Sequence, residues 1–277
     1  SPARPRSFED FVGQKRVVEN LLLAAKAAAA RGEPLGHVLL SGPAGLGKTT
    51  IARLLAESYG SSFQEVVAGN IADPHQLISI LARMEEGSFV FIDEIHALKS
   101  ACAELLYPAL EDGVVQVVVR QGGRTRLLRV RLEHFTLLGA TTRLGALEAP
   151  FRARFRLSEA LEPYGEEELA ELVARVAARL AAPVTFEAAL DVARRSRGIP
   201  REAIRLLERA RDIAQVSEMA DVSGASQDSG MSQVDVDSGV VLVPGDQRHS
   251  LSPDGVTCGN IKIVLMPKKS GETYGNG

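Results

Sequence analysis

The feature that most constrains this chain is the octapeptide GPAGLGKT at residues 42–49, which fits the pattern G-x-x-x-x-G-K-[ST]. An apolar run at residues 37–40 precedes it, and residues 48–59 carry apolar side chains at helical spacing. In a strand–loop–helix setting, backbone N–H groups converge on phosphate oxygens and the helix N-terminus favours negative charge. The motif therefore predicts a phosphate-binding loop, against the alternative of an accidental glycine-rich turn.

Two side chains of this loop have specific chemistry. Lys48 is expected to place a positive charge on the β- and γ-phosphates of a nucleotide, and the Thr49 hydroxyl is expected to ligate Mg²⁺. Glycine is needed where a Cβ atom would block the anion or forbid the turn.

A second apolar run, FVFIDE at residues 89–94, ends in two carboxylates. Taken alone, such a pair can be a solvated strand end. Together with the loop at residues 42–49, Asp93 is expected to complete the Mg²⁺ shell and Glu94 to polarise a water for attack on phosphorus. His96 is expected to shape this site rather than to bind a metal, because no second His or Cys lies at ligand spacing.

The pattern up to about residue 163 alternates strands with helices. A further apolar run lies at 135–138, weaker ones lie at 64–67 and 155–157, and a second helix is predicted over 74–86. This order predicts an α/β fold with a parallel sheet flanked by helices, which binds ligands at the carboxyl ends of its strands.

From residue 164 onward the strand signal gives way to helices. Helices are predicted over 166–180, from a Thr185 cap through 193, and from Pro200 to about 216. The predicted domains are therefore a nucleotide-binding domain (1–163), a small all-α lid (164–216) and an atypical tail (217–277).

Composition bears on three further questions: nucleic-acid binding, the order of the tail and the cellular compartment. The net charge is −3, with 28 basic and 27 acidic residues before position 217 and 4 basic and 8 acidic residues after it, which excludes nucleic-acid binding by bulk charge. The tail is rich in Ser and Gly, so disorder is an alternative to strands at 239–243 and 261–266. Two cysteines, no apolar leader and no bilayer-length apolar run favour an intracellular, cytoplasmic protein without a membrane span.

Several motifs occur in the order found in AAA+ ATPases: the residue 42–49 loop, DEIH at 93–96, GATTR at 139–143 and RGIPR at 197–201. Together with RPRSF at 4–8, FVGQ at 11–14 and LYPALED at 106–112, they make residues 3–216 resemble most closely the RuvB family of bacterial Holliday-junction branch-migration motors.

The resemblance implies roles for individual residues. Thr142 (or Thr141) would sense the γ-phosphate from the sheet, and Arg201 would sense it from the lid. The adenine end of ATP would contact Arg4, Phe11, Val12 and Tyr164. The phosphates would contact Gly45, Gly47, Lys48, Thr49 and Thr50.

Arg154 would be the arginine finger that enters the site of a neighbouring subunit, with Arg152 and Arg156 as competing candidates. The resemblance also places Glu111 and Asp112 near the neighbour's nucleotide. The position after them is usually aromatic in that family and is Gly113 here, which weakens this contact.

Residues 114–132 predict a basic β-hairpin that turns at QGG, residues 121–123. By the resemblance its apolar side would dock the junction-binding partner RuvA. The candidate contacts are Val117, Val119, Leu127 and Leu128. A solvated hairpin, or arginines that touch DNA phosphates or neighbouring subunits, are the open alternatives.

The resemblance implies an Mg²⁺-dependent ATP hydrolase that assembles as a hexameric ring and drives Holliday-junction branch migration in DNA recombination and repair. A AAA+ protein loader or remodeller, or a catalytically silent nucleotide-binding module, are the rivals. Residues 217–277 do not resemble the winged-helix DNA-binding domain of that family, so no DNA contact is assigned there and autonomous translocation is left open.

Overall fold

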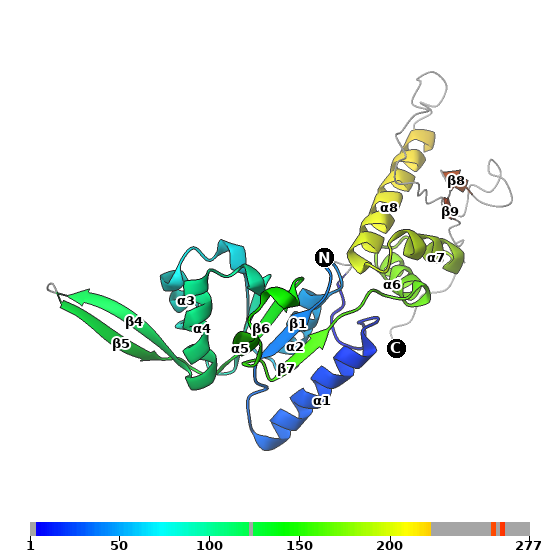
Figure 1. The fold of residues 1–277 in the computed structure, drawn as a ribbon. Coiled ribbons are helices and arrows are strands. Elements are labelled where there is room, and N and C mark those ends of the chain that lie inside the picture. The colour runs from blue at the N-terminus through cyan, green and yellow to red at the C-terminus, as the bar shows by residue number, and fades with distance from the viewer. Residues whose placement is uncertain (1–3, 122–123, 223–255, 259–260, 264–277) are drawn as a thin grey trace. The chain divides into compact units, whose positions relative to one another are not determined.

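The computed structural model describes residues 4–121, 124–222, 256–258 and 261–263. Residues 5–162 form one compact unit, and the described residues from Pro163 onward are grouped with Arg4 in a second unit. Figure 1 labels the elements along the chain. Within the described residues, no helix combines the length and apolarity needed to cross a membrane.

The first unit is built on a five-stranded sheet in the order β2-β3-β6-β1-β7, with every neighbouring pair parallel. The strands are β1 (Val38–Ser41), β2 (Phe63–Val67), β3 (Ser88–Asp93), β6 (Phe135–Thr141) and β7 (Leu157–Ala160). All residues of β1 and β6 are buried, as expected for a parallel sheet covered on both faces. The carboxyl ends of all five strands therefore meet at one edge.

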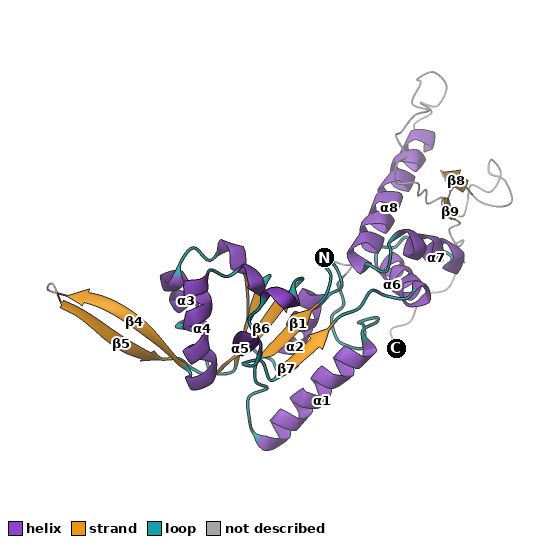
Figure 2. Ribbon diagram, viewed as in Figure 1, coloured by secondary structure: helices purple, strands orange, loops and turns teal. Residues whose placement is uncertain are grey.

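Helices and short 3₁₀ turns connect these strands (Figure 2). The helices are α1 (Lys15–Arg31), α2 (Lys48–Ser58), α3 (Pro74–Leu81), α4 (Ser100–Asp112) and α5 (Ala149–Arg152). The 3₁₀ turns are η1 (Ala68–Asn70), η2 (Ile95–Ala97) and η3 (Leu144–Ala146). The predicted α/β fold is confirmed.

Some predicted boundaries are wrong. The helix expected over 74–86 stops at Leu81, because Arg83 N–H and Met84 N–H bond three residues back in a tight turn that leads into β3. The strand expected at 155–157 begins only at Leu157, because Phe155 N–H bonds to the Arg152 carbonyl in a turn after α5. That turn buries Phe155 edge-on against Phe151.

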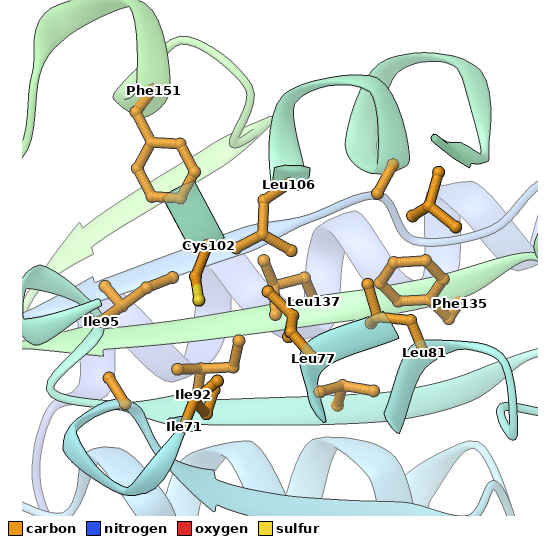
Figure 3. Packing of buried hydrophobic residues seen from close by; sticks show 14 of the residues in the cluster. Ile71, Leu77, Leu81, Ile92, Ile95, Cys102, Leu106, Phe135, Leu137 and Phe151 are labelled. Carbon is orange, nitrogen blue, oxygen red and sulfur yellow. The ribbon is translucent and has the colours of Figure 1, made fainter. Parts of the chain in front are cut away.

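The hydrophobic core of this unit lies between the sheet and helices α3 and α4 (Figure 3). Cys102, Leu106 and Ala109 occupy one stripe of α4, three or four residues apart, and all are buried there. They pack in the same cluster as Leu137 of β6, which fixes α4 over the middle of the sheet.

The predicted hairpin is confirmed as β4 (Val114–Gln121) paired with β5 (Arg124–Arg131). Only its base joins the core, where Val115 is buried opposite Val130. Side chains alternate between the two faces, so the pair Val117–Leu128 lies on the core face and the pair Val118–Leu127 on the opposite face. The four contacts predicted for one apolar side are therefore split, because Leu127 faces away from Val117 and Leu128.

The second unit contains α6 (Glu166–Arg179), α7 (Phe186–Arg195) and α8 (Pro200–Val222). The predicted cap is present, since Thr185 Oγ1 accepts a hydrogen bond from Ala188 N–H at 3.2 Å. Helix α8 continues six residues beyond the predicted end near 216. In the tail, β8 (Val256–Cys258) pairs with β9 (Ile261–Ile263), while the predicted strand at 239–243 lies outside the described residues.

Candidate nucleotide-binding site

The loop between β1 and α2 is shaped by glycine. Gly42 has φ = +136°, and a Cβ there would lie 2.5 Å from the Leu161 carbonyl oxygen, so no other residue fits. Gly47 has φ = +100°, and a Cβ there would meet the Phe11 ring at 3.3 Å. Positive φ angles at these glycines therefore give the loop a backbone conformation in which its N–H groups can face a bound anion. The Phe11 ring lies against the loop at Gly47.

Lys48 is the first residue of α2 and is 6% exposed. Its ammonium donates to the carbonyl oxygens of Gly42 at 2.8 Å and Pro43 at 2.9 Å. A buried cation at a helix N-terminus is an anion-binding arrangement, because the charge and the helix dipole both favour negative groups. A phosphate fits the donors that this loop presents.

Two acidic residues lie at the carboxyl end of β3, two strands from β1 in the sheet order. Glu94 N–H donates to Asp93 Oδ1 at 3.0 Å, and Glu94 has φ = +51°. This left-handed residue turns the chain sharply, so the two carboxylates leave the strand end in different directions. Within the described residues, no group of three or more His, Cys, Asp and Glu side chains is arranged to hold a metal ion.

The Glu94 carboxylate contacts the residues that follow β6. Its Oε2 accepts hydrogen bonds from Thr142 Oγ1 at 2.8 Å and from Thr142 N–H at 3.4 Å, and lies 3.1 Å from His96 Nδ1. His96 Nδ1 is also 2.8 Å from Thr141 Oγ1. The structure thus brings Glu94 and His96, which follow β3, together with Thr141 and Thr142, which lie 45 or more positions further along the chain at the end of β6. The contact of His96 with Glu94 agrees with the interpretation of His96 as a residue that shapes this site.

Arg154 follows α5 and contacts α4. Its Nη2 lies 3.1 Å from Glu111 Oε2, and its guanidinium carbon lies 5.5 Å from the centre of the Tyr107 ring. Its Nε is buried without a hydrogen-bond partner. Arg154 is half-buried, whereas the competing candidates Arg152 and Arg156 are exposed. Sequence reasoning missed Tyr107 as a partner of this arginine, although Tyr107 lies one turn before Glu111 on the same helix.

The remaining predicted nucleotide contacts are divided between the two units. Val12 is buried in the first unit, and Gly45, Thr49 and Thr50 lie in the loop and the first turn of α2. Arg4, Tyr164 and Arg201 belong to the second unit, and their nucleotide contacts stay predictions. Burial raises the pKa of Tyr164, and the charge of Glu168 adds to that rise, so this phenol stays protonated at neutral pH.

A parallel sheet with this glycine-lined loop, a buried lysine and paired acids, followed by a helical lid, defines a P-loop protein of the AAA+ class. The family model described as Holliday junction DNA helicase RuvB P-loop domain matches residues 3–161, and the model of the RuvB AAA lid domain matches residues 164–237. The chain belongs to the RuvB family.

Individual relatives and solved structures support the same family assignment. The chain is 46% identical over 220 residues to the Holliday junction branch migration complex subunit RuvB of Nostoc sp., covering 79% of this chain and 60% of that protein. It is 44% identical over 234 residues to the subunit from Salinibacter ruber, covering 84% and 68%. The structure of the Thermotoga maritima RuvB Holliday junction branch migration motor matches with a TM-score of 0.70 and 40% identity, over 79% of this chain and 68% of that one. The chain thus spans 60 to 68% of the length of these proteins.

Proposed function

We propose that this chain is the ATP-driven motor subunit of Holliday-junction branch migration, and that it hydrolyses ATP in a ring. The observation that carries the proposal is the buried ammonium of Lys48, held in a glycine-lined loop at the sheet edge where Asp93 and Glu94 also end. The relatives named above are branch migration complex subunits, which supports the assignment to junction DNA.

Each residue of the sheet edge has a role in this proposal. The backbone N–H groups from Gly42 to Thr49 hold the phosphates, and Lys48 exchanges its two carbonyl acceptors for phosphate oxygens, which carry more charge. Glu94 accepts the proton of the attacking water. Thr49 and Asp93 would hold Mg²⁺ together with phosphate oxygens and water, and the ion would neutralise charge that develops on those oxygens.

Arg154 completes the site of a neighbouring subunit in the proposed hexameric ring. An arginine that acts in trans makes hydrolysis depend on assembly, because the charge that develops on the γ-phosphate is neutralised only when two subunits meet. In the same proposal Arg4, Phe11 and Val12 contact the adenine end of the nucleotide, while Tyr164 and Arg201 reach it from the lid side. The domain limits are those predicted from the sequence.

The hairpin is the proposed docking element for the junction-binding protein RuvA. Val118 and Leu127 form an exposed cross-strand pair, 54% and 60% exposed, and large apolar side chains gathered in the open mark interaction sites. Arg129 and Arg131 share that face and are exposed. We place the complex in the cytoplasm, on junction DNA.

The test is ATP turnover measured with and without synthetic four-way junction DNA and purified RuvA. The proposal predicts that junction DNA and RuvA together stimulate turnover, and that replacing Leu127 with Asp removes the stimulation but leaves basal turnover intact. Basal ATP turnover that neither DNA nor RuvA changes would instead support a AAA+ protein remodeller.

A further inference from the structure

Gln14 ends the FVGQ motif at residues 11–14, and the proposed function gives it no role. It directly precedes α1, and its backbone has φ = +51° and ψ = +34°, in the left-handed region. A residue other than glycine takes this conformation at an energetic cost, so its surroundings must hold it there. The side chain of Gln14 provides such a hold, because it is bonded to the backbone of Glu162.

The carboxamide of Gln14 pairs with both backbone polar groups of Glu162. Its Nε2–H donates to the Glu162 carbonyl oxygen at 2.6 Å, and its Oε1 accepts from Glu162 N–H at 3.3 Å. Turning the carboxamide over would set oxygen against oxygen and N–H against N–H, so the partners fix its orientation. Gln14 therefore binds the chain after β7 as the backbone of a neighbouring strand would.

Two other side chains attach α1 to β7 independently of Gln14. Asn20 Nδ2 donates to Glu159 Oε1 at 3.0 Å, and Arg16 Nη1 donates to Glu159 Oε2 at 3.1 Å. The Glu159 side chain is 9% exposed, so both of its oxygens are bonded to α1 in a largely buried position. Loss of the Gln14 side chain is therefore expected to leave the helix in place and to release only the segment that leads into it.

Both sides of the Gln14 contact border the phosphate-binding loop. Phe11, three residues earlier in the chain, places its ring against the loop at Gly47. On the other side, the residue before the partner of Gln14 is Leu161, whose N–H donates to the Ser41 carbonyl at 2.8 Å, directly before the loop begins. The contact thus fixes the segment that carries Phe11 relative to the strand ends beside the loop.

We infer that Gln14 is a positioning residue for nucleotide binding: by pairing with Glu162, it holds Phe11 and Val12 where they contact the adenine end of the nucleotide. The inference rests on the proposed function, in which those two residues make that contact. Without the hold, the segment occupies the binding position for only a fraction of the time. The apparent affinity for the nucleotide then falls by that fraction.

Gln14→Ala removes both hydrogen bonds. One net hydrogen bond corresponds to about a fivefold population ratio, so ATP and ADP are each expected to bind about fivefold more weakly, as measured by calorimetric titration with Mg²⁺. The two losses are expected to be equal, because ATP and ADP share the adenine end and differ only in the γ-phosphate.

Gln14→Asn separates the hydrogen bonds from the backbone conformation. Asparagine keeps the carboxamide and tolerates the left-handed region, but its side chain is one carbon too short to reach both groups of Glu162. The same loss of affinity is expected as in Gln14→Ala. Unchanged affinity in Gln14→Asn would assign the loss to backbone strain and would overturn the inference.

Hydrogen exchange followed by NMR locates the change within the chain. Phe11 N–H donates to the Phe8 carbonyl at 3.2 Å, and it is expected to exchange faster in Gln14→Ala because its segment is released. Glu162 N–H loses its acceptor and is also expected to exchange faster. Leu161 N–H keeps its backbone acceptor and is expected to exchange as in the unmodified chain.

Glu19→Gln, at an exposed position of α1, is the control and is expected to change neither exchange nor affinity. Unchanged nucleotide affinity in Gln14→Ala, unchanged exchange at Phe11, or a loss confined to ATP would overturn the inference. Faster exchange within residues 42–49 would also overturn it, since the loss would then come from the phosphate-binding loop. If neither nucleotide binds to the unmodified chain, the proposed function fails and the inference with it, whereas exchange at Phe11 still shows whether Gln14 holds the segment.

Discussion

The guanidinium of Arg154 is paired at 3.1 Å with the carboxylate of Glu111, which lies in the last turn of helix α4. The Glu111 side chain is 54% exposed, and an ion pair this open to solvent contributes at most about 1 kcal/mol to stability. The pair therefore orients Arg154 more than it stabilises the fold. In the proposed role, Arg154 would exchange this weakly held partner for the phosphate of a neighbouring subunit.

If Arg154 is the arginine finger, as proposed, Arg154→Ala is expected to bind ATP with unchanged affinity and to lose about 10³–10⁵-fold in turnover, because a finger supplies its charge only in the transition state. Steady-state ATP hydrolysis beside an equilibrium titration measures both. Mixing this variant with Lys48→Ala is expected to restore part of the activity, since one subunit supplies the finger and the other supplies the loop. Mixtures no more active than their components would contradict action in trans.

Glu111→Gln removes the charge that orients Arg154 but keeps the side-chain length. Turnover is expected to fall by about tenfold or less, with the melting temperature nearly unchanged, since an exposed pair contributes little to stability. Glu104→Gln is the matched control, as it changes an exposed carboxylate on the same helix that instead accepts from Ser100 at 3.1 Å. A similar loss of turnover in both variants would show that the effect belongs to α4 in general.

Gly198 connects α7 to α8 and has φ = +76°, and a Cβ there would lie 2.8 Å from Pro163 Cβ and 2.9 Å from the Tyr164 carbonyl oxygen. Gly198→Ala is therefore expected to destabilise the lid by about 1–3 kcal/mol, through strain at an unfavourable φ and the displaced backbone. Gly165→Ala is the control in the same unit, because a Cβ at Gly165 meets nothing within 4 Å. Chemical denaturation compares them, and equal stabilities would refute the close approach.

His37 links helix α4 to the sheet. Its Nδ1 accepts from Leu137 N–H at 3.0 Å, so its Nε2–H donates to the Leu110 carbonyl at 3.2 Å. Burial lowers the pKa of His37 below its ordinary value of 6.5, although the Leu110 hydrogen bond opposes the shift. Between the folded and unfolded pKa values, the unfolded chain binds more protons, so the stabilising contribution is complete above pH 6.5 and is lost as pH falls toward the folded pKa.

His37→Gln is expected to lower the free energy of unfolding at pH 7.5 and to flatten its decline as the pH falls below 6.5 toward the folded pKa of His37. Denaturation at several pH values measures this, with His75→Gln, at an exposed position, as the control. A variant that loses stability with the same pH slope as the unmodified chain would contradict a buried neutral His37.

The sequence was sufficient to predict the phosphate-binding loop, the acids at the end of β3 and the order of the elements, because each depends on residues close together in the chain. It could not predict where α3 stops, since Arg83 and Met84 are compatible with a helix and the turn is imposed by the start of β3. The partners of Arg154 and Glu94 were also out of reach. Those contacts join α4 to the turn after α5, and β3 to β6, and only the packed sheet brings them together.

The hairpin shows a further limit. Its residues identified both strands and the turn, but the division of Val117, Leu127 and Leu128 between two faces depends on the pairing register. A shift of one residue in one strand would exchange those faces. Composition and alternation alone therefore predicted an apolar surface without predicting which side chains share it.

The central claim is that the loop from Gly42 to Thr49 holds the phosphates of ATP through its backbone and Lys48. Calorimetric titration of the folded chain with ATP and Mg²⁺, beside Lys48→Ala, tests this most directly. The expected result is saturable binding at about one nucleotide per chain, lost or strongly weakened in Lys48→Ala while its circular dichroism and melting temperature stay close to those of the unmodified chain. Equal affinities in the two proteins, or no binding to the unmodified chain, would contradict the claim.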